Sequence, residues 1–249
     1  MSAPSHDPMK PLEGSVALVT GASRGVGAAV AVELARLGAH CVLTARTQGG
    51  LEETDDAIRA LGGQATLLPL DLMRDAEKVD MLGPSIVQRF GRLDILVHAA
   101  GVLAKLTPTA HIMPRDWEEA LAVNLSACWR LIRTCDPPLR VAPAGRAVVL
   151  TDDVVARPRA YWGLYGAGKA GQEHLVRSWA EEVARSNLRV NLFDPGPVAT
   201  RLRAMAMPGE DPATLRQPAD VAPAIAALCL PTETRHGEVA RPVHPGVPA

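Results

Sequence analysis

Short apolar runs alternate with longer helical stretches along almost the whole chain. Several runs are nearly continuous apolar segments, which is typical of parallel strands covered on both faces. Because parallel strands need crossover helices of fixed hand, the alternation predicts an α/β fold, a doubly wound parallel sheet of about seven strands with helices on both faces. The expected strands are Val16–Thr20, His40–Ala45, Ala65–Leu70, Leu93–His98, Arg146–Thr151 and Leu188–Phe193, with a weaker seventh at Glu238–Val243. The expected helices lie near residues 26–37, 50–61, 75–90, 115–135, 162–185 and 218–229.

Composition agrees with one layered domain. Hydrophobic residues make up 47% of the 249 residues and charged residues 21%, so burial can offset chain entropy and wholesale disorder is excluded. No repeat or composition break marks a linker, so we expect a single domain over residues 11–249 and a flexible tail over 1–10. The Pro-, Gly- and Met-rich segment 194–217 is interpreted as the substrate-loop region, because long loops of this kind commonly form a lid or wall.

Charge and cysteine usage exclude several classes of protein. Lys and Arg number 26 against 27 Asp and Glu, a net charge of −1 that argues against a nucleic-acid binder. The four cysteines are scattered without a C-x-x-C pair, so we expect neither a disulfide framework nor a metal site, and a reducing cytoplasmic location. No apolar run reaches about 18 residues, so no membrane span is expected.

A glycine-rich turn directly follows the first expected strand and opens an Ala-rich helix. Gly21, Gly25 and Gly27 give the spacing G-x-x-x-G-x-G. Such glycines permit a tight turn, close approach of the backbone to a pyrophosphate, and close helix–strand packing. The helix N-terminus supplies free N–H groups and a positive dipole end for the anion. The strand-turn-helix context therefore predicts a dinucleotide site rather than an ordinary turn.

The end of the second expected strand indicates which dinucleotide is bound. NAD-specific sites usually carry an acid there for the ribose 2′-hydroxyl, but this strand ends Thr44-Ala45-Arg46. The guanidinium groups of Arg24 and Arg46 suit a 2′-phosphate, although each alone reads equally well as a solvated surface arginine. Together, and without the acid, they favour NADP(H) over NAD(H).

Tyr165 and Lys169 lie four residues apart in the fifth expected helix, on one helical face. A neighbouring ammonium stabilises a phenolate and lowers its pKa, so the phenol can exchange a proton with a carbonyl or alcohol as hydride moves. The spacing alone is also common in surface pairs. Its position after the fifth strand, where the carboxyl ends of the sheet form a ligand crevice, favours the catalytic interpretation.

Taken together, these motifs resemble the short-chain dehydrogenase/reductase family over nearly the whole chain. Besides Thr20–Gly27, Tyr165 and Lys169, the matching pieces are Asp71-Leu72, Ala100-Gly101, Asn124 and Asp194–Thr200, in the family's order. The resemblance implies that Asp71 contacts the adenine, that Lys169 also holds the nicotinamide ribose, and that Asn124 anchors a water in a proton relay. The cofactor residues it implies are Gly21, Ser23, Arg24, Gly25, Val26, Gly27, Arg46, Asp71, Leu72, Ala99, Ala100, Gly101, Tyr165, Lys169, Pro195, Gly196, Val198 and Thr200.

Two positions depart from the family pattern. His98 stands where the family's N-N-A-G has its first asparagine, and is interpreted as a structural substitute rather than a base. The family's catalytic serine lies 13 residues before the tyrosine, a position held here by Asp152, with Asp153 next to it and Thr151 as the nearest hydroxyl. An ionised carboxylate accepts hydrogen bonds but cannot donate one to a carbonyl.

Two functions remain open on these residues. The first is an NADP(H)-dependent short-chain dehydrogenase/reductase that interconverts a ketone or aldehyde and an alcohol, with Tyr165 as acid/base and Lys169, Asn124 and Asp152 as further catalytic residues. The alternative is a low-turnover or inactive NADP(H)-binding protein that acts as a sensor or scaffold, which Asp152 favours. Tyr165 favours the enzyme, since a pure binder needs Lys169 but no tuned phenol.

Substrate and assembly are constrained only in part. The substrate pocket is expected to be lined from 103–112, 154–162 and 197–206, with four arginines nearby that read most simply as solvated. Helices around 115–135 and 162–185 carry apolar residues on more than one face, and a helix of that kind needs a second partner. We therefore expect a homodimer or homotetramer.

Overall fold

The computed structural model describes residues 10–242, and a seven-stranded parallel sheet runs through them. The strand order is β3-β2-β1-β4-β5-β6-β7, which confirms the doubly wound topology. The strands are β1 Val16–Thr20, β2 His40–Ala45, β3 Ala65–Pro69, β4 Ile95–His98, β5 Arg146–Leu150, β6 Arg189–Phe193 and β7 Val239–Ala240. Apart from Lys10, the predicted tail lies outside the described residues, as does Val243 at the end of the seventh predicted strand.

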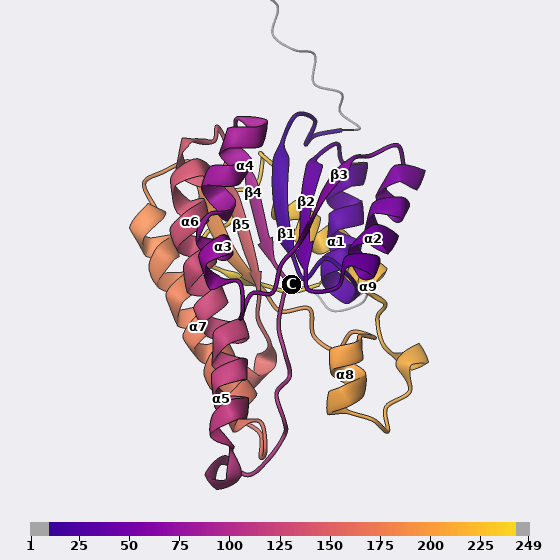
Figure 1. Cartoon of the computed structure of the whole chain (residues 1–249), viewed down its shortest axis with the longest axis vertical. Coiled ribbons are helices and arrows are strands. Elements are labelled where there is room, and N and C mark those ends of the chain that lie inside the picture. The colour runs from indigo at the N-terminus through magenta and orange to yellow at the C-terminus, as the bar shows by residue number, and fades with distance from the viewer. Residues whose placement is uncertain (1–9, 243–249) are drawn as a thin grey trace, which may run out of the picture.

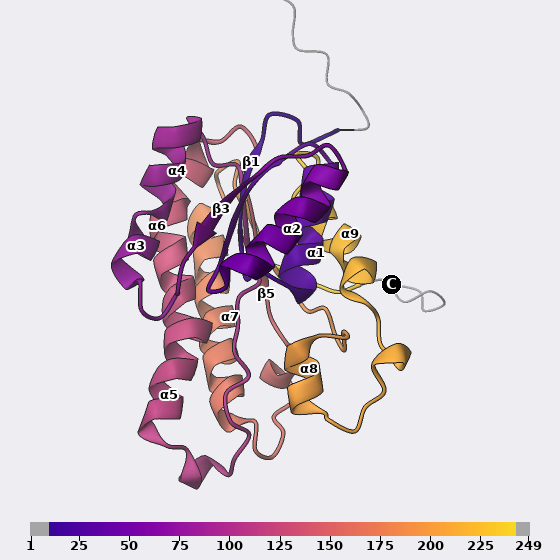
Figure 2. The same ribbon diagram turned by 45° about the vertical axis from the view of Figure 1, so that its right-hand side comes forward.

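Helices cover both faces of the sheet (Figures 1 and 2). They are α1 Gly25–Arg36, α2 Gln48–Ala60, α3 Ala76–Asp80, α4 Leu82–Phe90, α5 Pro114–Leu121, α6 Ala127–Val141, α7 Gly163–Val183, α8 Arg201–Ala206 and α9 Pro218–Ala227. In both views α1, α2 and α9 lie on one face and α3, α4, α6 and α7 on the other. Each layer closes its own core, one centred on Val30, Leu34 and Ile225, the other on Leu131, Val176 and Leu192.

The structure corrects the predicted helices at three places. The single helix expected at 75–90 is two helices, α3 and α4, which meet at Met81. The helix expected at 115–135 contains a π-helical stretch at Ala122–Ser126, and it continues through two prolines to Val141. The segment expected to be loop at 194–217 contains α8, whose start is capped because the Thr200 hydroxyl accepts a hydrogen bond from the Arg203 N–H at 3.2 Å.

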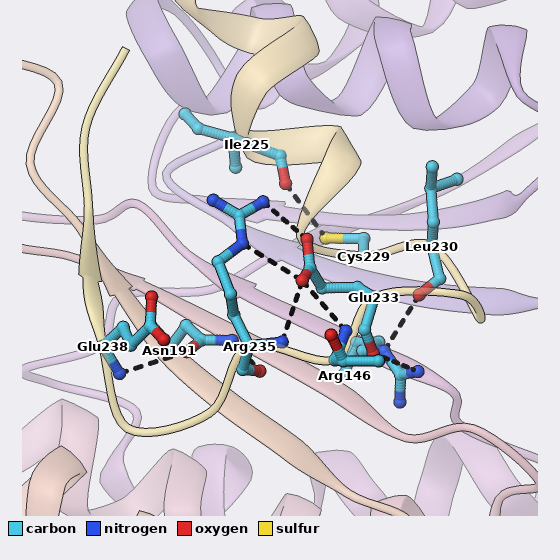
Figure 3. Close-up of polar contacts among 9 residues, drawn as sticks. Arg146, Asn191, Ile225, Cys229, Leu230, Glu233, Arg235 and Glu238 are labelled. Atoms are coloured by element: carbon cyan, nitrogen blue, oxygen red, sulfur yellow. Dashed lines mark hydrogen bonds and ion pairs between the residues drawn. The ribbon is translucent and has the colours of Figure 1, made fainter. Parts of the chain in front are cut away.

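A buried arginine ties β5 to the segment that follows α9 (Figure 3). Arg146 is only 4% exposed, and its guanidinium donates to the carbonyls of Leu230 at 2.9 Å and Glu233 at 3.0 Å. The Asn191 amide of β6 donates to the carbonyl of Arg235 at 2.8 Å. These bonds satisfy backbone oxygens of an irregular segment and lead the chain to β7, the last strand of the sheet.

Candidate active site

A cavity of about 1360 Å³ opens at the carboxyl ends of the strands, where the order of the sheet reverses between β1 and β4. Its size accommodates a dinucleotide together with a small substrate. All the predicted cofactor residues line it, as does Asp152. Asn124 is the predicted site residue that does not. Figure 2 shows α8 beyond the end of the sheet, and this helix forms one wall.

The glycine-rich turn between β1 and α1 has the geometry of an anion cradle. Gly21 has a φ of +68°, and a Cβ atom there would lie 2.7 Å from the backbone nitrogen of Ala100. Gly25 has a φ of +59°, and a Cβ atom there would meet only the Thr200 side chain, at 3.5 Å, so the cavity side is open. The first turn of α1 contains no acidic residue, and Arg24 before it makes no capping hydrogen bond. These residues fit a pyrophosphate at the helix N-terminus.

Two arginines flank the cradle at the side of β2. Arg24 precedes α1 and Arg46 follows β2, and both are exposed and line the cavity. Within residues 10–242 neither forms an ion pair with a carboxylate. Their charge is therefore available to an anionic ligand.

Lys169 is buried at the floor of the cavity and is 5% exposed. Its ammonium donates to the Leu150 carbonyl at 2.8 Å and to the Gln172 Oε1 at 2.9 Å. Burial lowers the pKa of Lys169 to about 8, against the opposing effect of the Asp152 charge. Gln172 was not among the predicted site residues. Its position three residues after Lys169 on the same helix is the only signal in the sequence that the two side chains meet.

Asn124 lies in the π-helical stretch between α5 and α6 and is fully buried. Its Oδ1 accepts from the Val102 N–H at 2.9 Å, and its Nδ2 donates to the Val102 carbonyl at 2.8 Å. A Cβ atom at Gly101 would meet the Asn124 Oδ1 at 3.3 Å and the Lys169 Nζ at 3.8 Å. The side chain thus holds the loop after β4 next to the lysine rather than facing the cavity.

Tyr165 and Asp152 are joined directly. The Tyr165 hydroxyl donates to the Asp152 Oδ2 at 3.2 Å, and the Asp152 Oδ1 accepts from the Val154 N–H at 3.0 Å. Burial and then the Asp152 charge raise the pKa of Tyr165 well above its ordinary value. Burial also raises the pKa of Asp152, and the neighbouring charge of Asp153 adds to that. The carboxyl in the serine position therefore opposes formation of the phenolate.

Neither Thr151 nor His98 replaces the missing serine. The Thr151 hydroxyl donates to the Glu173 Oε2 at 3.0 Å, away from Tyr165. His98 is buried and does not line the cavity, and its Nδ1 lies 2.7 Å from the Thr20 hydroxyl. Burial and then the Lys169 charge lower the pKa of His98 to about 3, so the ring stays neutral near pH 7.

The outer wall of the cavity carries arginines that are mostly neutralised by acids. Arg159 pairs with Asp153 at 2.7 Å and Arg241 with Asp194 at 3.0 Å, while Arg203 pairs with Glu210. Arg241 was not among the predicted site residues, because it comes from the segment after β7, which is far in the sequence from the residues that were predicted. Arg157 and Arg201 line the same cavity, and no ion pair to either is found among residues 10–242.

One predicted wall of the substrate pocket is wrong. Residues 103–112 do not line the cavity, whereas parts of 154–162 and 197–206 do. Leu103 instead packs beneath the site against Val154, Trp162 and Tyr165. Apolar residues of this segment pack against the side of Tyr165 that faces away from the cavity. A hydrophobic pattern in the sequence cannot distinguish such a supporting segment from a wall of the substrate pocket.

Comparison with known proteins identifies the family. The model of the short chain dehydrogenase family matches residues 15–211, which is most of the chain. The chain belongs to the short-chain dehydrogenase family. It is 35% identical over 214 residues to the uncharacterized oxidoreductase YciK of Escherichia coli K12, covering 85% of this chain and 84% of that protein. It is also 35% identical over 189 residues to the 3-oxoacyl-acyl-carrier-protein reductase FabG of Pseudomonas aeruginosa, covering 76% of each.

Solved structures of short-chain dehydrogenases share the architecture. A chain from Pseudomonas syringae superposes with a TM-score of 0.90 at 33% identity, covering 98% of this chain and 100% of that one. A Shigella flexneri 2a chain complexed with NADP gives a TM-score of 0.89 at 33% identity, with coverages of 94% and 98%. Over residues 10–242, no helix is long and apolar enough to cross a membrane, and no group of three or more His, Cys, Asp or Glu is placed to hold a metal. The protein is therefore an oxidoreductase of the short-chain dehydrogenase family.

Proposed function

We propose that the protein is an NADP(H)-dependent oxidoreductase that interconverts a carbonyl compound and an alcohol, with Tyr165 exchanging the proton. The observation that carries this proposal is that the Tyr165 hydroxyl and the Lys169 ammonium line the same cavity as the glycine-rich cradle. A bound nicotinamide dinucleotide supplies or accepts the hydride. Tyr165 donates a proton to the carbonyl oxygen in reduction and takes one from the alcohol in oxidation.

The other predicted site residues are given matching roles in this proposal. Lys169 holds the nicotinamide ribose and stabilises the phenolate, and Asp71 contacts the adenine. Asn124, whose amide is bound to Val102, holds the loop after β4 beside Lys169 instead of anchoring a relay water. The pyrophosphate lies at the N-terminus of α1. The remaining predicted contacts to the dinucleotide come from Ser23, Val26, Leu72, Ala99, Ala100, Gly101, Pro195, Gly196, Val198 and Thr200, all of which line the cavity. Residues 194–217 form the substrate loop.

NADP(H) is the proposed cofactor, in preference to NAD(H). Support comes from Arg24 and Arg46, which line the cavity without a carboxylate partner among residues 10–242, and from Ala45 where an acid would hold the ribose. Two of the similar structures were solved with NADP and NADPH, respectively. Calorimetric titration with both cofactors tests the preference, and equal or tighter binding of NAD(H) would contradict it.

A cytoplasmic homodimer or homotetramer without nucleic-acid partners is the proposed state of the protein. Trp117 of α5 and Trp129 of α6 are 44% and 45% exposed, respectively, so both helices present apolar surface to solvent, and within the protomer the Trp129 ring is covered only in part, by two arginines of α6. By contrast Trp179 of α7 is buried within the protomer, where its indole donates to Asp136 at 2.7 Å. Light scattering at micromolar concentration checks the assembly, and a monomer would count against it.

The alternative, a binding protein with little turnover, rests on Asp152 alone and is not favoured. A protein that only binds the dinucleotide needs Lys169 but no tyrosine hydroxyl aimed into the cavity. The deciding experiment measures NADPH oxidation over a panel of activated ketones, diketones and aldehydes. Consumption above the background of a Tyr165→Phe variant supports the enzyme, and no consumption over the whole panel would leave the binding function.

A further inference from the structure

Asp152 differs from the other carboxylates that line the cavity. Asp153, Asp194 and Glu210 are each paired with an arginine, and Asp71 lies 4.0 Å from Arg74. Within residues 10–242, Asp152 has no cation within ion-pair distance, although it lies at the reaction centre beside Tyr165. A partly buried carboxylate without a partner is costly, so a proton or a bound cation is expected to neutralise it.

The groups that face Asp152 leave room for such a cation. Its two oxygens accept from the Val154 N–H and from the Tyr165 hydroxyl, which are both neutral donors. Asp153 adds a second negative charge nearby. The Lys169 ammonium acts on Asp152 through space, but donates to Leu150 and Gln172 instead. From α8, the charge of Arg203 also acts at a distance, because its guanidinium is bound to Glu210.

A carbonyl oxygen is poorly matched to this centre. It carries lone pairs only, and so it needs donors, yet Asp152 presents lone pairs, the Thr151 hydroxyl is bound to Glu173, and the Tyr165 hydroxyl donates to Asp152 itself. A nitrogen that carries both a proton and a positive charge is the complementary group, because it donates to the carboxylate and neutralises it.

From this match we propose that Asp152 binds the N–H of an iminium group, so that the preferred substrate of the site is a protonated C=N compound rather than a ketone. The inference rests on the proposed hydride transfer from the dinucleotide, and it replaces the carbonyl group by a C=N group as the preferred acceptor. In the reduction, the iminium carbon gains a hydride from reduced nicotinamide dinucleotide, and the π electron pair of the C=N bond becomes the lone pair of the nitrogen. The nitrogen keeps its proton, so the products are a neutral amine and the oxidised dinucleotide.

The first test measures binding without turnover. Calorimetry on the dinucleotide-free protein at pH 7 compares pyrrolidinium, piperidinium and azepanium with cyclopentanol, their neutral counterpart. We expect Asp152→Ser to weaken binding of the ammonium ions about tenfold or more, since a hydrogen bond to a charged group is lost, and to leave cyclopentanol within about threefold. Asp194→Asn is the matched control, because this carboxylate lines the same cavity and is already paired with Arg241, and it should change ammonium binding by less than about threefold.

The second test measures specificity. With saturating NADPH, kcat/KM is compared for 1-pyrroline and for cyclopentanone, which have the same ring size. The wild-type protein should favour the imine, and Asp152→Ser should lower the ratio of the two values about a hundredfold, with imine reduction falling and ketone reduction rising. Circular dichroism and thermal melting of each variant confirm that it is folded.

The outcomes separate the two proposals. Ammonium binding that is equal in the wild type and Asp152→Ser, or absent at millimolar concentration for all three ions, overturns the inference, as does a kcat/KM ratio that Asp152→Ser leaves unchanged. Reduction of ketones by the wild type under those results still supports the proposed oxidoreductase. Loss of ammonium binding in Asp152→Ser without turnover of any imine or carbonyl compound would support the cation site and contradict the oxidoreductase.

Discussion

The two halves of the cavity are built on different physical principles. In the half formed by β1, β2 and α1, backbone sterics define the shape: Gly21 packs against Ala100, and Gly25 leaves the approach to the helix terminus open. In the half formed by β5 and α7, side chains define it, through hydrogen bonds among Asp152, Tyr165 and Lys169 with their backbone partners. The first half therefore tolerates few residue types, and its proposed role is to bind the pyrophosphate of the cofactor.

The difference determines how each half responds to change. A glycine turn has no ionisable group, so the geometry of the cofactor half does not depend on pH. The reaction half contains three groups with shifted pKa values, and the Asp152 charge acts on both Tyr165 and Lys169, so removing that charge alters the pKa values of the other two. Substitutions in the two halves should therefore separate cofactor affinity from turnover.

Replacing Tyr165 with Phe should produce the largest effect. The variant loses the proton donor for a carbonyl oxygen, so kcat for ketone reduction should fall about a thousandfold, while the dissociation constant for NADPH changes by less than about twofold. Calorimetry and initial rates of NADPH oxidation are the measurements. A variant that keeps most of its activity would remove Tyr165 from the mechanism, and one that loses NADPH affinity in parallel would show that the two halves are not separable.

Asp152→Ser should increase kcat/KM for simple activated ketones at neutral pH about ten- to a hundredfold, because it supplies the missing donor and removes the charge that raises the Tyr165 pKa. In the wild type, protonation of Asp152 restores an O–H as pH falls through its raised pKa, so activity on ketones should gain on the acid side. The variant should lack that gain. Paired pH–rate profiles check this, and a variant slower than wild type on ketones at every pH would refute the interpretation of a handicapped serine site.

The sequence predicted the strand, turn and helix of the cofactor half, because the signals for these elements are local. Strand β1, the glycine turn and α1 follow one another directly, and all the cofactor residues inferred from the family resemblance line one cavity. The apolar pattern predicted the helices less well where tertiary contacts and caps determine the backbone conformation. The π-helical stretch at Ala122–Ser126 lies inside a segment whose apolar pattern predicts one continuous α-helix, and α8 depends on a cap by Thr200 inside a segment without periodicity.

In the reaction half, the sequence predicted which residues stand at the site but not which ion pairs and hydrogen bonds they form. Counting 13 residues back from Tyr165 located Asp152. The sequence contains no signal that Asp194 pairs with Arg241, 47 residues further along the chain. This pair is one of those that leave Asp152 as the cavity-lining carboxylate without a cation among residues 10–242. Arg146 is a further example, since a charged residue at the start of a strand gives no indication that carbonyls of the segment after α9 will surround it. Long-range pairing of this kind has no periodic signature in a sequence.

Arg46→Ala tests the cofactor half, with a moderate expected effect. Loss of one guanidinium should weaken NADP(H) binding about tenfold and leave NAD(H) binding within about twofold, because only NADP(H) carries the 2′-phosphate. Calorimetric titration of both cofactors measures the two constants. Arg157→Ala is the matched control, an exposed arginine of the same cavity on the reaction side, and should affect neither. Equal losses for both cofactors would contradict the assignment.

His98→Asn should give the smallest effect, and this effect should be on the free energy of unfolding and not on turnover. The residue lies between the cofactor half and the reaction half of the cavity. His98 ends β4, and its buried ring contacts Thr20 at the end of β1. Burial lowers its pKa from 6.5 to about 3 in the folded protein, so above pH 6.5 the ring is neutral in both states and its protonation does not affect the free energy of unfolding. As pH falls below 6.5, the unfolded chain takes up a proton that the folded chain does not, and stability is lost.

The asparagine variant lacks this titration, so its free energy of unfolding should change less between pH 8 and pH 6 than that of the wild type, by about 1 kcal/mol. That difference corresponds to roughly 2–4 °C in Tm for a chain of this size. Thermal melting of both proteins across pH 8 to pH 5 measures it, and the offset between them at pH 8 removes any pH-independent cost of the substitution. Parallel Tm curves would mean that His98 is protonated in the folded state, and that the strand end next to Lys169 admits a second positive charge.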